Sequence, residues 1–295
     1  MNKIKYSIII PHKNIPQLLE RCLKSIPEDD SIQVIVVDDC SEDQKSLRQV
    51  INSLKRRNVE CYYLEKSGGA GYARNIGLRY LRGKWTLFAD ADDFFANNFV
   101  ESLDKYFNSE SEIIFFSSLS VDSDSLSPIE SRVTIVDEFI ARDLVDRLRY
   151  CYYVPWAKMI RSSLIINKKI LFDESYVCND AMFSIRTGHY ATTIDASTDK
   201  IYVSTMRKDS LFFKISEERL EERYNILMKR INKQLIEWGK WKYRHNTFQA
   251  LNMFKKISIN CYKKHLLNAL YEEQKMWLFF DFIVYYAKKA LGKKV

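Results

Sequence analysis

Three carboxylates lie within four residues at Asp90, Asp92 and Asp93, directly after the apolar run WTLFA (85–89). Carboxylates this close repel one another, so a fold that keeps them together usually gives them a cation or a donor-rich ligand. A cation held by few protein carboxylates and shared with phosphate oxygens would be Mg²⁺ or Mn²⁺. The alternative is that one aspartate caps the next helix and the others are solvated.

Two further polar clusters follow apolar runs. Asp38 and Asp39 end the run QVIVV (33–37), where a carboxylate commonly accepts hydrogen bonds from a ribose or a base, although a turn role fits either residue equally well. The stretch GGAGYARN (68–75) precedes a predicted helix, where free N–H groups and the helix dipole favour phosphate. It matches neither the GxGxxG fingerprint nor the phosphate loop that ends in Gly-Lys-Ser/Thr.

The elements that must position these residues alternate along the chain. Helical patterns over 18–26, 47–54 and 70–81 lie between apolar runs that predict buried strands, and we expect Gly83 to cap the third helix. This alternation predicts an α/β fold with a mostly parallel sheet, in which ligands bind beyond the carboxyl ends of the strands. The predicted strands are YSIII (6–10), QVIVV (33–37), ECYYL (60–64), WTLFA (85–89) and EIIFF (112–116).

We expect one α/β domain over 1–210 and a basic, aromatic-rich helical region over 211–295. The Ser/Asp-rich segment 117–135 predicts a loop. A length of 295 residues and a hydrophobic content of 46% suffice for a sizeable core. From Ser216 onward 17 Lys and Arg face 8 Asp and Glu, a net charge of +9, so the preceding part of this +8 chain carries −1.

The six cysteines form no CxxC pair, and the sequence indicates neither a zinc site nor a redox dithiol, which suits a reducing compartment. The apolar run before Pro11 is about five residues, shorter than the roughly 7–15 of a signal peptide. No stretch reaches the roughly 18–20 apolar residues of a membrane span, because Asp281 interrupts MWLFFDFIVYYA (276–287). We therefore expect a cytoplasmic protein, at the inner face of the membrane if the tail contacts lipid.

The order of the motifs carries more weight than any one of them. YSIIIPHKN, then VIVVDDCSED, then GGAGYARNIGLRYLRGKWTLFADADDFF resembles the family 2 glycosyltransferases, bacterial inverting enzymes of the GT-A type, over roughly the first 100 residues. VPWAKMIRSSLI, FDESYVCNDAMF and VSTMRKDS look like the acceptor side of the same family. The resemblance implies a Rossmann-like nucleotide-binding domain with a donor half over 1–116 and an acceptor half over 117–210.

The resemblance also implies site residues. Asp90 and Asp92 would form the DxD pair on Mn²⁺ or Mg²⁺, with Asp92 the direct ligand and Asp93 nearby as a third metal residue. His12 departs from the small or apolar residue that is usual after the proline, and we assign it to the donor loop. The implied donor-binding residues are Pro11, His12, Asn14, Asp38, Asp39, Lys66, Gly68, Gly69, Arg74, Asn75, Asp90 and Ala91.

Asp180 matches the place of the catalytic base, which takes the proton of the acceptor hydroxyl. Asn179 stands where the family usually has glutamate, and Asp180 alone would equally suit an N-cap. On the acceptor side the weaker candidates are Trp156, Lys158 and Arg207; a tryptophan in such a run is more often core, and a surface role fits Arg207 as well.

The implied function is transfer of a sugar from a nucleotide-sugar, expected to be a UDP-sugar, to a saccharide or lipid-linked acceptor in surface polysaccharide synthesis. Displacing the diphosphate builds negative charge that a divalent cation stabilises. A sugar nucleotidyltransferase is the alternative, but PHKNIPQ (11–17) lacks the glycine-rich basic loop expected there. A nucleotide-sugar binding protein without turnover is a third hypothesis, which Asn179 keeps open.

The basic tail interleaves lysines with aromatic residues, most densely in MWLFFDFIVYYAKKALGKKV (276–295). Such a segment suits an anionic membrane surface. It suits equally a helical region whose aromatics pack on the catalytic domain or on a second copy in a homodimer. No nucleic-acid-binding signature accompanies it, and we expect no nucleic-acid partner.

Overall fold

The computed structural model describes residues 4–130, 135–142, 145–207, 216–271 and 275–292. The chain divides into two compact units, Met1–Lys208 and Asp209–Val295, which are taken separately below. The domain boundary expected near residue 210 lies outside the described residues.

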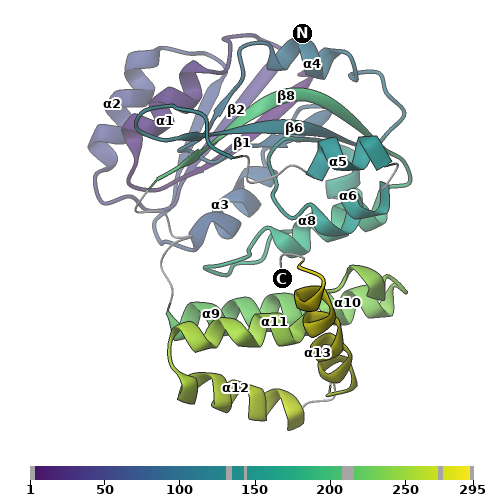
Figure 1. The fold of residues 1–295 in the computed structure, drawn as a ribbon. Coiled ribbons are helices and arrows are strands. Elements are labelled where there is room, and N and C mark those ends of the chain that lie inside the picture. Colours follow the sequence, from purple (N-terminus) through teal and green to yellow (C-terminus); the bar gives the residue numbers. More distant parts are fainter. Residues whose placement is uncertain (1–3, 131–134, 143–144, 208–215, 272–274, 293–295) are drawn as a thin grey trace. The chain divides into compact units, whose positions relative to one another are not determined.

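The first unit is built on an eight-stranded sheet in the order β3-β2-β1-β4-β7-β6-β8-β5. Figure 1 labels four of these strands, β1, β2, β6 and β8. The pairs β3-β2, β2-β1, β1-β4 and β6-β8 are parallel, whereas β7 and β5 run antiparallel to their neighbours. The expected α/β class with a mostly parallel sheet is confirmed. The strands are β1 (Tyr6–His12), β2 (Ile32–Asp38), β3 (Val59–Tyr63), β4 (Trp85–Phe88), β5 (Phe94–Phe95), β6 (Ile113–Asp122), β7 (Lys158–Arg161) and β8 (Ile194–Met206).

Helices cover both faces of this sheet, which is why β1 and β2 are buried along their whole length. Side chains alternate between the faces, so Ile8 and Ile10 join the core beside α1 and α2 while Ile9 joins the core beside α3 and α8. The helices are α1 (Pro16–Lys24), α2 (Gln44–Leu54), α3 (Gly69–Leu78), α4 (Phe99–Asp104), α5 (Ile135–Arg142), α6 (Val145–Cys151), α7 (Ser162–Asn167) and α8 (Ala181–Tyr190).

Two local expectations were wrong. The first six residues of the predicted loop 117–135 continue β6, because parallel pairing with β8 and a 2.8 Å hydrogen bond between Ser120 Oγ and Ser204 Oγ accommodate the polar residues. Gly83 does not cap α3, which ends at Leu78. A Cβ at Gly83 would lie 2.5 Å from the Ser7 backbone nitrogen, so this glycine allows close approach to β1.

The second unit is helical, as expected. Its helices include α9 (Glu217–Tyr224), α10 (Asn232–Glu237), α11 (Thr247–Asn252), α12 (Ile259–Tyr271) and α13 (Lys275–Ala290), with a π-helix over Asn225–Ile231. Asp281, the charge inside the apolar run, is buried and accepts hydrogen bonds from Arg244 at 2.5 and 2.9 Å and from the Thr247 N–H at 2.7 Å. No helix of the described residues is long and apolar enough to cross a bilayer.

Candidate active site

The first strand end of the site carries a buried pair, His12 and Asp38. Parallel pairing sets these two residues side by side at the ends of β1 and β2. The Ile15 N–H donates to His12 Nε2 at 3.2 Å, so the ring proton is on Nδ1, which donates to Asp38 at 2.8 Å. Burial opposes ionisation of Asp38, but hydrogen bonds from His12 and Ser41 outweigh it and lower the pKa of the carboxyl. Asp38 therefore holds the chain segments that follow β1 and β2 through its hydrogen bonds to His12 and Ser41.

Asp39 holds the start of α3. Its carboxylate accepts hydrogen bonds from the backbone N–H groups of Gly68 at 2.7 Å and Gly69 at 3.1 Å, and from Ser67 Oγ at 2.7 Å. Gly69 has a φ of +83°, a conformation that glycine adopts without strain. The anion that these N–H groups favour is thus supplied within the chain by Asp39.

The other donor-loop residues lie around this pair. Pro11 is buried inside β1, while Asn14 is exposed in a left-handed turn (φ 56°) and accepts a hydrogen bond from the Glu42 N–H at 2.9 Å. Lys66 is exposed beyond the end of β3, where it lines a hollow of about 350 Å³. The residues that line this hollow are Tyr63, Leu64, Glu65, Lys66 and Tyr72.

Asp90 is tied to the acceptor half through Arg74. Arg74, buried on α3, donates to Asp90 Oδ1 at 2.5 Å and to Asn179 Oδ1 at 2.9 Å. Arg74 therefore joins the first carboxylate of the DxD pair to the segment of the predicted base. The residue that replaces the family's usual glutamate, Asn179, serves here as an acceptor for this guanidinium.

Asp92 has an arginine of its own. Arg207 Nη2 lies 2.8 Å from Asp92 Oδ2, and the Asp92 side chain is a quarter exposed. Burial raises the pKa of the Asp92 carboxyl, the negative charge of Asp90 adds to the rise, and Arg207 opposes it. Ala91, between the two aspartates, is buried. The carboxylates of Asp90 and Asp92 are partly exposed, and each is paired with an arginine.

Asp93 turns away from the other two. Its oxygens accept hydrogen bonds from the Tyr202 hydroxyl at 2.7 Å and from the Thr205 N–H at 2.6 Å, and the residue is buried. Burial raises its pKa well above the usual range, and the charges of Asp90 and Asp92 raise it further. The structure thus speaks against Asp93 as a metal ligand, because both oxygens already have protein partners.

Asp180 stands at the N-cap position of α8, but within the described part of the chain its side chain makes no capping hydrogen bond. The alternative role as a helix cap is therefore not supported. Burial raises the pKa of Asp180, with Arg74 opposing and Asp90 adding to the rise. A carboxylate with a raised pKa is a stronger base than an ordinary aspartate.

Three other predicted site residues have structural partners. Asn75 exchanges hydrogen bonds with the Phe172 backbone at 2.8 and 3.0 Å instead of facing the donor side. Trp156 is buried and stacks on Tyr202 with ring centroids 5.0 Å apart, so it belongs to the core. Lys158 is fully buried, donates to the Tyr152 carbonyl at 2.7 Å, and burial lowers its pKa to about 7. The structure therefore places both side chains in the interior of the first unit.

Sequence reasoning missed Tyr202 and Arg21. The Tyr202 hydroxyl accepts the Asp90 N–H at 2.9 Å besides donating to Asp93, and Arg21 donates to the Asp92 carbonyl at 2.7 Å. Both fasten the turn that carries the aspartates. A tyrosine in a strand and an arginine in an amphipathic helix are too ordinary to be singled out by sequence.

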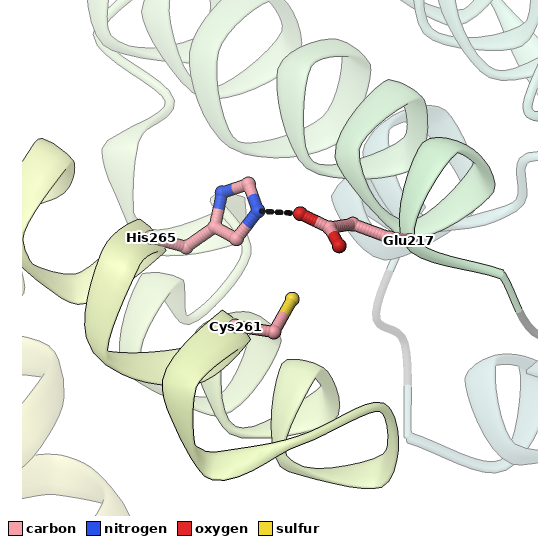
Figure 2. Close-up of side chains that lie close together, drawn as sticks. All are labelled: Glu217, Cys261 and His265. Carbon is pink, nitrogen blue, oxygen red and sulfur yellow. Dashed lines mark ion pairs between the residues drawn. The ribbon is translucent and has the colours of Figure 1, made fainter.

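The helical unit contains a second cluster of metal-ligating side chains, Glu217, Cys261 and His265 (Figure 2). Cys261 and His265 are four residues apart and share a face of α12, and His265 Nε2 lies 3.4 Å from Glu217 Oε1. Lys264 already donates to the same oxygen at 3.0 Å, and this bond, followed by that from His265, lowers the pKa of Glu217. Because the Lys264 ammonium already balances the charge of the Glu217 carboxylate, we interpret the cluster as an ion-pair network between α9 and α12.

Comparison with known proteins agrees with this geometry. The sequence model described as glycosyl transferase family 2 matches residues 7–167. The poly(ribitol-phosphate) β-N-acetylglucosaminyltransferase TarS of Staphylococcus aureus is 24% identical over 292 residues, covering 93% of this chain and 48% of the relative. A poly(ribitol-phosphate) β-glucosyltransferase of Bacillus spizizenii is 27% identical over 219 residues, covering 70% of this chain and 33% of the relative. The chain thus spans about half or less of these curated relatives.

Solved structures share the fold. S. aureus TarS 1–349 in complex with UDP-GlcNAc superposes with a TM-score of 0.65 at 22% identity, covering 94% of this chain and 79% of that one. The mannosyltransferase PcManGT of Pyrobaculum calidifontis, in complex with GDP-Man and Mn²⁺, superposes with a TM-score of 0.55 at 15% identity, covering 98% and 88%. These likenesses establish the GT-A architecture of the chain.

Proposed function

Because the chain belongs to family 2 of the glycosyltransferases, we propose that it transfers a sugar from a nucleotide-sugar to a saccharide or lipid-linked acceptor, with inversion, in surface polysaccharide synthesis. One observation carries the proposal. Asp90, at the end of β4, is bound to Arg74, which also holds the segment of Asp180 through Asn179. A candidate base, two half-buried carboxylates and their two arginines therefore lie in one group.

We propose a UDP-sugar as the donor. Support comes from TarS, which was solved with UDP-GlcNAc and with UDP. The hollow beyond β3 is bordered by Tyr63 and Tyr72, whose rings suit stacking with a base, and by Lys66, whose charge suits an anionic donor. The hydrogen bonds of three buried residues would fix the backbone on this side of the pocket. His12 bonds Asp38, and Asp39 accepts the Gly68 N–H.

The residues fit a divalent cation at Asp90 and Asp92. Only one oxygen of each has an arginine partner, at 2.5 and 2.8 Å, and crowding between the two carboxylates contributes to the raised pKa of Asp92. Oxygen ligands of this kind suit Mn²⁺ or Mg²⁺ bound together with a diphosphate. When bound, the cation would stabilise the negative charge of the leaving diphosphate.

Asp180 is the proposed base. It takes the proton from the acceptor hydroxyl as that oxygen bonds to the anomeric carbon, and the bond between this carbon and the diphosphate oxygen breaks on the opposite face. One displacement inverts the anomeric configuration. Arg207 forms an ion pair with Asp92. When the nucleotide-sugar binds, Arg207 would exchange this partner for the diphosphate.

We propose that the acceptor is lipid-linked and that the chain acts at a membrane surface. A lipid-linked acceptor would place the enzyme in the cytoplasm at the inner face of the membrane, with the basic helical unit on the lipid. The six cysteines, all within the described residues, form no disulfide, which suits this reducing compartment.

Thermal melting with UDP, GDP, CDP and TDP, each with and without Mn²⁺, tests the donor site, because a ligand that binds only the folded protein raises its melting temperature. We expect a rise with UDP that requires metal and disappears in Asp92→Ala. Glu101→Ala, which removes an acidic residue of α4, is the control and should keep the rise. If no nucleotide raises the melting temperature of the folded protein, the chain has no nucleotide-sugar donor site and the transferase proposal fails.

A further inference from the structure

The outward face of α13 (Lys275–Ala290) is apolar. Exposed side chains recur at spacings of three and four residues and therefore lie along one side of the helix. Leu278 and Asp281 are buried on the other side, where the helix packs within its own unit. The exposed apolar residues, with 43–79% of their surface accessible, are Met276, Phe279, Phe280, Phe282, Ile283 and Tyr286.

A surface of this kind requires a covering partner. Single exposed hydrophobic residues are common on proteins, but a contiguous row of aromatic and aliphatic side chains is not. A helix that is apolar on both sides is normally buried on both sides. The one charge between Met276 and Tyr286, Asp281, is turned inward and paired with Arg244, so no charged side chain interrupts the row.

The charge around this face identifies the partner's chemistry. Two exposed lysines follow the apolar row on the same helix, and of these Lys289, seven residues after Phe282, lies at the edge of the row, whereas Lys288, seven residues after Asp281, lies on the opposite side. The chain from Ser216 onward carries a net charge of +9, from 17 basic and 8 acidic residues. Apolar side chains bordered by lysines match a lipid interface, where acyl chains lie beneath anionic head groups.

We propose that the outward face of α13 binds the surface of an anionic lipid bilayer. The helix lies in the plane of the membrane, Phe279 and Ile283 enter the head-group boundary, and Lys289 meets the lipid phosphates. The 16 residues of the helix extend about 24 Å along that surface. A symmetric pairing of two copies is less favourable, because it would bring two strongly basic units together. This inference rests on the proposed function, since it places the enzyme where a lipid-linked acceptor would be.

Vesicle co-sedimentation of the full chain tests the surface. We expect binding to vesicles of phosphatidylglycerol and phosphatidylcholine in equal parts and none to phosphatidylcholine alone. The double variant Phe279→Asp/Ile283→Asp should weaken binding at least about tenfold, since two charges must then enter an apolar layer. Ile166→Asp/Leu171→Asp makes the same change at residues of similar exposure in the first unit and should bind like the parent.

Three results would overturn the inference. They are equal binding of the parent and Phe279→Asp/Ile283→Asp, no binding to anionic vesicles, and a dimer in solution that only this variant dissociates, which would assign the face to a second copy. Circular dichroism of each variant, measured beforehand, tests whether it is folded. The UDP-dependent melting shift is measured on the same samples, so failure of the lipid surface is distinguished from failure of the donor site.

Discussion

At the scale of single residues, the site is a set of charges that compensate one another. Arg74 bonds Asp90 and Arg207 bonds Asp92, so both proposed metal ligands have a cationic partner without any ligand bound. Among the described residues Asp180 makes no side-chain capping bond, which would leave its carboxylate available for the proposed proton transfer. The residue with the proposed proton-transfer role is therefore the one that the local helix does not use.

Asp180→Asn should reduce sugar transfer by about 100- to 10,000-fold, the usual contribution of a general base. The UDP-dependent melting shift should persist, because the amide has the same shape. In the parent, burial raises the pKa of Asp180 and only the ionised form accepts a proton, so kcat/KM should fall as the pH drops through that raised pKa. Transfer that survives in Asp180→Asn would assign the base elsewhere.

His12→Ala should destabilise the first unit by about 1–3 kcal/mol, since Asp38 is fully buried and loses a hydrogen-bond partner. The pKa of Asp38 is lowered in the folded state, so its stabilising contribution is present above the unfolded pKa of about 3.9 and is lost as the pH falls through the lower folded value. Urea unfolding at neutral and acidic pH measures both. An unchanged unfolding free energy at neutral pH would contradict the role of the pair.

At the scale of elements, β8 reaches across to fix the turn after β4. The Tyr202 hydroxyl accepts the Asp90 N–H and donates to Asp93, while its ring stacks on Trp156. Thr205 N–H completes the attachment to Asp93. The position of the two proposed metal ligands therefore depends on a strand that lies more than a hundred residues further along the chain.

Tyr202→Phe should lower the free energy of unfolding by about 1–3 kcal/mol, because it leaves Asp93 Oδ2 and the Asp90 N–H each without their Tyr202 partner, while Asp93 Oδ1 keeps the Thr205 N–H. It should also reduce the Mn²⁺-dependent part of the UDP melting shift. Tyr152→Phe is the matched control, since Tyr152 is buried and its hydroxyl has no hydrogen-bond partner among the described residues. Equal effects of the two substitutions would show that Tyr202 contributes only its ring.

At the scale of the whole molecule, charge is unevenly distributed. The chain before Ser216 carries −1 and the remainder +9. The proposed donor site pairs its aspartates with arginines, whereas the helical unit carries a basic surplus that the proposed lipid surface would balance.

Raising the ionic strength from about 0.05 to about 0.5 M should therefore weaken vesicle binding, because the Debye length falls from above 10 Å to below it. The UDP-dependent melting shift should change much less, since the arginine–aspartate pairs of the site are partly buried and weakly screened. Titrations at the two salt concentrations compare these effects. Vesicle binding that does not respond to salt would show that the lysines contribute nothing.

The sequence by itself determined the class of the fold, the family resemblance and the motif set. Strand and helix periodicities are local properties, and the carboxyl ends of parallel strands share one edge, so Asp38 and Asp90 could be assigned to one rim before any coordinates. The buried strands and the helical character of the tail follow from the same local patterns.

Only the tertiary structure decided what each candidate touches. Asp93 and Asp90 look alike in sequence, yet the Tyr202 hydroxyl donates a hydrogen bond to Asp93. Asp90 instead accepts a hydrogen bond from Arg74. Lys158 is buried beside Phe115 of β6, and Asn75 is bound to the Phe172 backbone, because segments distant in the sequence pack on them. Hydrogen-bond partners separated by a hundred residues leave no periodic signal, since they arise from packing and not from local spacing.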